Sequence, residues 1–335
     1  MSSFRPSPPP SPPPSPPRSS YPSLPRSLSA SLSSSFDALS AKRRLHERGY
    51  LLDPYLAQLF PPRASSSSKG LTSQTGPNAP LINRGYYARC SAVDASVSSF
   101  LSSPGPRQVV EVGAGRSTLF WRHLAPPSPP RPGVSWFEID HPLVVEEKRA
   151  AIAACAACRG LLQERPDALT LVPLDLSSPS PSLLSAAPNL SPSLPTLFIF
   201  EAVLMYVPAA PAAELLAHLS SSFPLGELVV YDPVVGKGKY GQRMLENLRR
   251  AGVGEGGLTA ARDLKAVKRR YEDAGFGGVE VESMLTFYGG GMGREGRELC
   301  EGLEALDEVE EWEMIMSHYY VARAKCGGGG SGGAV

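Results

Sequence analysis

Residues 109–118 read VVEVGAGRST, a valine-rich run that leads into two glycines and then into a helical pattern. Such a run is typical of a buried strand, and the glycines permit the tight turn that follows it. In an open α/β sheet, ligands bind outside the carboxyl ends of the strands, where a G-x-G turn lets them approach the backbone. This stretch therefore predicts a site for a cofactor that contains adenosine. A G-x-G alone is weak evidence, because a plain strand-to-helix turn can share it.

The next predicted strands place acidic residues at the same edge of the sheet. The second strand ends in Phe-Glu-Ile-Asp at Asp140, where a carboxylate can accept hydrogen bonds from both ribose hydroxyls. Asp175 follows the third strand and Glu201 ends the fourth. Thr118 occupies the position where an NAD site would have its third glycine. Glycine or acidic residues at four successive strand ends indicate one cofactor site at that edge.

Short apolar runs alternate with helical patterns along the chain, which is the signature of a parallel α/β sheet. The seven predicted strands lie at 108–112, 134–139, 169–174, 196–200, 227–232, 279–287 and 317–324. The main helical patterns lie at 142–157, 208–221, 241–251, 260–274 and 294–314. The sequence thus predicts an α/β, Rossmann-like fold in which a seven-stranded, mostly parallel sheet has helices on both faces.

The chain holds 35 prolines and 32 glycines among its 335 residues, well above the usual combined share of about 12%. Residues 1–36 contain no Asp or Glu and run through SPPPSPPPSPP into a serine-rich tract. We expect one folded domain over 38–325, flanked by segments that cannot bury a core. The expected units are a disordered Ser/Pro-rich segment (1–37), a helical lid (38–105), a sheet core with substrate-side insertions (106–325) and a flexible glycine-rich tail (326–335).

The charge balance offers no general attraction to nucleic acid or to an anionic membrane. There are 33 basic and 32 acidic residues, a net charge of +1. We therefore expect neither nucleic acid nor membrane as a partner. The most apolar stretch, 194–213, contains Glu201 and three prolines, which disfavours a membrane span.

Five scattered cysteines and five histidines give no recognisable metal or disulfide framework. The C-x-x-C at 155–158 lies in an alanine-rich helical pattern and is expected to be incidental. No metal is expected, and the odd cysteine count favours a reducing compartment. We expect a cytoplasmic protein. The alternative is that residues 1–36 form an organelle transit peptide, although their prolines disfavour an amphipathic import helix.

Eight sequence blocks, in order between Ser40 and Ala324, resemble the leucine carboxyl methyltransferase family, a family of class I S-adenosylmethionine-dependent methyltransferases. INRGYYAR and GQRMLENL are specific to that family rather than general to methyltransferases. The blocks are AKRRLHERGYLLDPY (41–55), LINRGYYARCSAVD (81–94), EVGAGRSTLFWR (111–122), WFEIDHP (136–142), LDL (174–176), FEAVLMYV (200–207), YGQRMLENLRRAG (240–252) and ALDEVEEWEMIMSHYYVARA (305–324).

The resemblance implies S-adenosylmethionine as cofactor and assigns roles to individual residues of this chain. Gly113 matches the glycine under the methionine portion, and Asp140 matches the acid that binds the ribose. Asp175 and Leu176 match the pair around adenine. The assignments agree with bare chemistry, since a carboxylate accepts hydrogen bonds from hydroxyl groups.

The other end of the implied cofactor site is charged. Glu201 matches the acid near the cofactor's amino group, and Lys42 and Arg89 match two basic residues that engage its carboxylate. Tyr206 would line a pocket for the substrate's leucine, or would simply belong to the core. The resemblance gives no cofactor role to two other arginines in matched blocks, Arg84 and Arg116.

The implied reaction is methyl esterification of the C-terminal leucine α-carboxylate of the protein phosphatase 2A catalytic subunit, whose C-terminal tail would be the partner of a monomeric enzyme. An α-carboxyl group has a pKa of about 3.5, so no catalytic acid or base is expected. Alignment and exclusion of water would suffice, and Arg89 could also steer the acceptor carboxylate.

Three alternatives stay open beside this function. One is a phosphatase-binding scaffold without catalysis, and another is a small-molecule carboxyl or hydroxyl O-methyltransferase of the same fold. A third is a relative that acts on modified tRNA, in which a similar domain is joined to a kelch propeller. Because only ten residues follow Lys325, we expect no propeller here.

Overall fold

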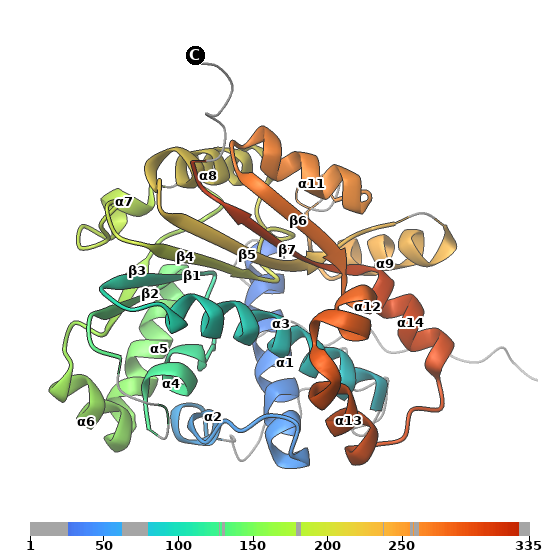
Figure 1. The fold of residues 1–335 in the computed structure, drawn as a ribbon, viewed down its shortest axis with the longest axis horizontal. Helices are drawn as coiled ribbons and strands as arrows, with labels where there is room; N and C mark the ends of the chain where they lie inside the picture. The colour runs from blue at the N-terminus through green and yellow to red at the C-terminus, as the bar shows by residue number, and fades with distance from the viewer. Residues whose placement is uncertain are drawn as a thin grey trace, which may run out of the picture.

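A computed structural model describes residues 26–61, 80–126, 128, 131–178, 182–236, 238–254, 257 and 261–327. Seven strands form one sheet in the order β3-β2-β1-β4-β5-β7-β6 (Figure 1). The strands are β1 (Arg107–Val112), β2 (Val134–Asp140), β3 (Leu169–Pro173), β4 (Thr196–Glu201), β5 (Gly226–Pro233), β6 (Gly277–Ser283) and β7 (Tyr319–Lys325).

The sheet is parallel except at one edge. Strand β1 pairs in parallel with β2 and β4, β2 with β3, and β4 with β5. Strand β7 runs antiparallel between β5 and β6. This topology confirms the predicted Rossmann-like fold. Strands β2 and β3 lie on one side of β1, whereas β4 and β5 lie on its other side. The strand order therefore reverses between β1 and β4. Sheets of this kind bind their ligands in the crevice at such a reversal.

Alternate residues of the central strands face two separate apolar cores. Val109 and Ile199 belong to one core, whereas Val110 and Phe198 belong to the other, and all four side chains are fully buried. This pattern follows from the two-residue period of a strand in a sheet that is covered on both faces.

Helices cover both faces of the sheet (Figure 1). The first core is shared with α1 (Arg26–Arg48), α2 (Tyr55–Leu59), α3 (Pro80–Ser102), α4 (Leu119–Leu124), α5 (Pro142–Ala154), α6 (Ala156–Glu164), α12 (Met284–Thr286), η2 (Phe287–Gly291), α13 (Gly293–Leu303) and α14 (Val309–Ser317). The second is shared with α7 (Leu183–Ala186), α8 (Ala209–Ser222) and α11 (Leu264–Asp273). Among the described residues, no helix combines the length and the apolar composition needed to cross a bilayer.

The amphipathic helix α9 (Lys239–Arg250) packs separately, beside the loop that follows β4. Its Leu245 and Leu248 contact a small cluster built on Met205 and Val253. This cluster fixes the outer side of the post-β4 loop.

The predicted disordered segment, 1–37, extends too far along the chain. Helix α1 already begins at Arg26, so the expectation of disorder is wrong for residues 26–37. Leu32 and Leu39, seven residues apart, are buried, and this packing gives the serine-rich segment its helix. Residues 1–25, 62–79 of the predicted lid and 328–335 of the predicted tail lie outside the described residues, while Cys326 is buried against Gly226.

Three further elements differ from the sequence prediction. The expected helix over 142–157 is broken at Cys155 into α5 and α6. Residues 284–286, expected to be strand, form the short helix α12. The expected single helix over 294–314 is broken into α13 and α14. At this break, Tyr50 Oη and Asn83 Nδ2 each donate a hydrogen bond to the Glu304 carboxylate, and Arg84 Nη2 donates to its backbone oxygen at 3.0 Å. Long-range contacts therefore decide where α13 ends.

Candidate functional site

A cavity of about 190 Å³ opens at the carboxyl ends of β1 and β4, where the strand order reverses. Its wall contains all eight residues for which sequence analysis proposed a binding role. These are Lys42, Arg89, Gly113, Asp140, Asp175, Leu176, Glu201 and Tyr206. The structure thus brings together residues that are spread over much of the chain, and it places them where a doubly wound sheet binds its ligand.

The turn after β1 requires glycine. Gly113 has a φ of +69° and Gly115 a φ of +55°, in the left-handed region that other residues rarely adopt. A Cβ atom on Gly113 would lie 2.7 Å from Val203 Cγ2, closer than van der Waals contact allows. The missing side chain therefore lets the β1 turn and the loop after β4 lie in close contact beside the cavity.

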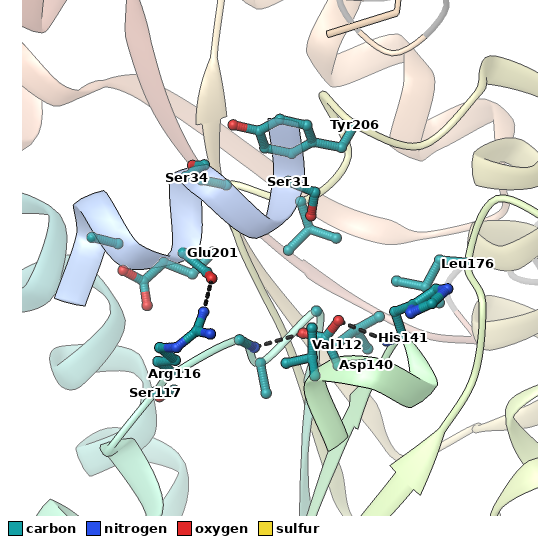
Figure 2. A pocket seen from close by; sticks show the side chains of 18 of the residues that line it. Ser31, Ser34, Val112, Arg116, Ser117, Asp140, His141, Leu176, Glu201 and Tyr206 are labelled. Atoms are coloured by element: carbon teal, nitrogen blue, oxygen red, sulfur yellow. Dashed lines mark hydrogen bonds between the residues drawn. The ribbon is translucent and has the colours of Figure 1, made fainter. Parts of the chain in front are cut away.

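Asp140 is held at the cavity wall by the backbone. Its Oδ2 accepts a hydrogen bond from Gly115 N and its Oδ1 accepts one from His141 N, both at 2.6 Å (Figure 2). Burial raises the pKa of Asp140, and these two N–H groups oppose that shift. The carboxylate is therefore fixed in one orientation, as an acceptor for the hydroxyl groups of a sugar should be.

The β3 end of the cavity offers one polar and one apolar contact. Asp175 Oδ1 accepts hydrogen bonds from Ser177 N at 2.9 Å and from Ser177 Oγ at 2.6 Å. Leu176 is half-buried beside it and lines the cavity. A carboxylate next to an aliphatic side chain suits a flat base that carries an amino group.

The opposite end of the cavity is charged. Glu201 Oε2 lies 3.1 Å from Lys42 Nζ, and Glu201 Oε1 lies 2.5 Å from Arg89 Nε. Burial favours protonation of Glu201, but attraction to both cations outweighs it and lowers the pKa to about 2. Attraction to Glu201 likewise outweighs burial and raises the pKa of Lys42 and Arg89. At neutral pH, two cations therefore face a single anion.

The backbone directly after Glu201 is strained. Ala202 has a φ of +59°, the one positive φ at a residue other than glycine in the described part of the chain. Its N–H donates to Tyr231 O at 2.7 Å. Such a conformation costs on the order of 1–3 kcal/mol and persists only where the surroundings impose it. Here it turns the chain sharply at the cavity, just after Glu201.

The N-terminal part of helix α1 forms a wall of the cavity that the sequence did not predict, because residues 26–37 were expected to be disordered. Figure 2 shows Ser31 and Ser34 on α1 across the cavity from Asp140 and His141. The signal in the sequence is the spacing of Leu28, Leu32 and Leu39, which marks one face of a helix.

Arg116 attaches α1 to the glycine turn. Its Nη1 donates to Ser35 Oγ at 2.5 Å, its Nη2 pairs with Glu147, and its guanidinium carbon lies 3.3 Å from the centroid of the Phe36 ring. The family resemblance implies no cofactor role for Arg116, and its contacts form a bridge between α1 and α5. Arg84, the other arginine without a role, lies at the α13–α14 break instead.

Two buried carboxylates lie side by side behind the glycine turn. Glu111 on β1 is in register with Glu138 on β2. Glu138 Oε2 pairs with Lys148 Nζ at 2.5 Å, whereas Glu111 Oε2 has no hydrogen-bond partner among the described residues. Burial and repulsion by Glu138 raise the pKa of Glu111 to about 7.

Glu111 therefore makes stability depend on pH. Folded Glu111 keeps its proton to about pH 7, whereas the unfolded chain loses it near the ordinary value of 4.5, so stability falls as the pH rises between these values. We expect Glu111→Gln to raise the free energy of unfolding at pH 8 by roughly 1–3 kcal/mol, and by less at pH 5.

Urea denaturation at both pH values measures this effect. Glu138→Gln is the matched control, because it removes the ion-pair partner of the buried Lys148 and should destabilise the protein. A Glu111→Gln variant that is no more stable than the parent at pH 8 would show that Glu111 carries no burial penalty.

Comparison with known sequences places the chain among methyltransferases. The profile of the family described as leucine carboxyl methyltransferase matches residues 30–220. Leucine carboxyl methyltransferase 1 of Yarrowia lipolytica is 31% identical over 307 residues, which cover 86% of this chain and 94% of the relative. The human tRNA wybutosine-synthesizing protein 4 is 32% identical over 307 residues, but the matched region covers only 43% of its length.

Comparison with solved structures agrees on the fold. A candidate methyltransferase from Thermobifida fusca superposes with a TM-score of 0.54 at 16% identity, over 81% of this chain and 92% of that one. Family match, identity and coverage therefore lead to one assignment. The chain belongs to the leucine carboxyl methyltransferase family and is an S-adenosylmethionine-dependent methyltransferase.

Proposed function

We propose that this protein transfers a methyl group from S-adenosylmethionine to the C-terminal leucine α-carboxylate of the protein phosphatase 2A catalytic subunit. The observation that carries the proposal is the cluster of Lys42, Glu201 and Arg89 at one end of the cavity. The cluster has one more cation than anion, which suits both an amino-acid zwitterion and an incoming carboxylate. The near full-length match to the Yarrowia leucine carboxyl methyltransferase supports the choice of acceptor.

The residues present fit the cofactor. Gly113 has no side chain at the cavity wall, so a bound methionine portion could approach its backbone, and the fixed Asp140 carboxylate would accept hydrogen bonds from the ribose hydroxyls. Leu176 would contact the adenine ring, and Asp175 would accept from its amino group. These roles are the ones that the family resemblance implies, and the chemistry of the groups that line the cavity agrees with them.

The charged cluster would exchange partners with the cofactor. In the structure, Glu201 forms ion pairs with both Lys42 and Arg89. The carboxylate of the ligand would take over the two cations, and Glu201 would pair with the ligand's ammonium group. No buried charge is left without a partner in either state, which avoids the cost of stranding a charge in the interior.

Catalysis then depends on how the chain places the acceptor carboxylate relative to the cofactor's methyl group. When bound, the cofactor supplies an electrophilic methyl group on a sulfonium. A C-terminal α-carboxyl is already ionised at neutral pH, so no residue has to remove a proton. The chain has to hold the acceptor in line and keep water away from it. Helix α1 closes one side of the cavity, where Ser34 shares a hydrogen bond with Tyr206, the residue we place nearest the acceptor.

Modified tRNA is a second candidate acceptor, because the human tRNA wybutosine-synthesizing protein 4 matches this chain at 32% identity. The net charge of +1 gives no general attraction to a polyanion, which favours the protein acceptor. The two candidates can be separated in one assay.

The assay measures the transfer of labelled methyl groups from S-adenosylmethionine. We expect the phosphatase 2A catalytic subunit to acquire a methyl ester that mild base releases as methanol. The same subunit without its terminal leucine should acquire none, and tRNA should stay unlabelled. Failure to label the intact subunit, or label on tRNA instead, would refute the proposed acceptor.

The glycine turn gives a second prediction. Gly113→Ala should weaken binding of S-adenosylhomocysteine more than tenfold, because its Cβ would meet Val203 at the cavity wall. Gly105→Ala is the matched control, since Gly105 also has a positive φ, +92°, but a Cβ there meets no atom within 4 Å. Calorimetry should show unchanged affinity for the control. Equal affinities of both variants would mean that Gly113 does not border the bound cofactor.

A further inference from the structure

Two tyrosine rings lie against the guanidinium group of Arg89. Its carbon is 5.3 Å from the centroid of the Tyr86 ring and 5.1 Å from that of Tyr231. Both distances are within the range of about 6 Å over which an aromatic face attracts a cation. Tyr86 precedes Arg89 by three residues on α3, so the two share a helix face, whereas Tyr231 comes from β5.

Tyr231 is itself rigidly held. Its ring stacks on Tyr319 of β7, with centroids 5.5 Å apart and planes inclined by 10°. The residue is only 6% exposed. Its backbone oxygen also accepts the hydrogen bond from Ala202, the strained residue that follows Glu201. One residue thus contacts both the cation and the chain segment that carries its anionic partner.

The nitrogens at the edge of the Arg89 guanidinium are hydrogen-bond donors, whereas the two tyrosine rings lie against its carbon. Nε donates to Glu201 Oε1 at 2.5 Å. For the terminal nitrogens, the described part of the chain supplies no hydrogen-bond acceptor, and Arg89 lines the cavity. The rings leave these N–H groups free for a ligand, and a fixed guanidinium plane can pair with both oxygens of a carboxylate.

We propose that Tyr231 and Tyr86 are positioning residues, which hold the Arg89 guanidinium so that its terminal N–H groups bind the carboxylate of the cofactor. The proposal rests on the role given to Arg89 under the proposed function. The two rings keep water from the guanidinium, which strengthens its electrostatic interactions. They also remove rotational freedom before the ligand arrives, so less is lost on binding.

Calorimetry with two ligands tests this role. S-adenosylhomocysteine carries the amino-acid carboxylate, whereas 5′-methylthioadenosine lacks the whole amino-acid group. We expect Tyr231→Leu to raise the Kd for S-adenosylhomocysteine roughly three- to thirtyfold, as for the loss of a cation–π contact. The Kd for 5′-methylthioadenosine should change less than twofold. Tyr231→Phe keeps the ring and should bind both ligands like the parent.

A thermodynamic cycle shows whether the Tyr231 ring acts through Arg89. In an Arg89→Ala background, Tyr231→Leu should cause no further loss of affinity, because the ring would act only through Arg89. Tyr86→Leu, at the half-buried ring on the other side of Arg89, should show the same ligand selectivity and replaces Tyr231→Leu if that variant does not fold. Equal losses for both ligands, or unchanged affinity for S-adenosylhomocysteine in both leucine variants, would overturn the proposal.

These measurements contain no methyl acceptor. A negative result in the methyl-ester assay would therefore leave the tyrosine proposal standing, and a negative result here would leave the proposed acceptor standing.

Discussion

A buried carboxylate between two cations ties the sheet to the helices that cover it. Glu201 ends β4, Lys42 comes from α1 and Arg89 from α3, and their side chains are only 10–13% exposed. Breaking such a pair typically costs about 3–5 kcal/mol, because the remaining charge stays in a medium of low dielectric. The two helices are thus held at the carboxyl edge of the sheet by polar contacts, and we propose that a zwitterionic ligand takes these contacts over.

Two unusual backbone conformations lie beside this cluster, at Ala202 and Gly113. Ala202 adopts a strained backbone conformation directly after Glu201, and the Tyr231 carbonyl accepts its N–H. Gly113 turns the chain at the neighbouring strand end, and its missing side chain lets Val203 of the loop after β4 lie close to it. Strain and missing side chains lower stability locally, so their position around one cavity fits a site whose geometry matters more than its contribution to folding.

The sheet and the polar strand ends around the cavity could be predicted because their signals are local. Each strand is a short apolar run; Gly113 directly follows β1, and Asp140 and Glu201 are the last residues of β2 and β4. The first half of α1 was missed because its serines favour disorder, while the burial of Leu32 depends on tertiary packing. The contact between Arg89 and Tyr231 could not be predicted either, since no spacing rule joins residues on different elements so far apart in sequence.

The direct test of partner exchange at Glu201 is a calorimetric comparison of two ligands on the unaltered protein. One is S-adenosylhomocysteine, and the other is its analogue without the carboxyl group, which brings an ammonium but no anion. Because the cluster already has one cation in excess, we expect the analogue to bind at least about 50-fold more weakly, as two charged hydrogen bonds are lost. Equal affinities would contradict the exchange.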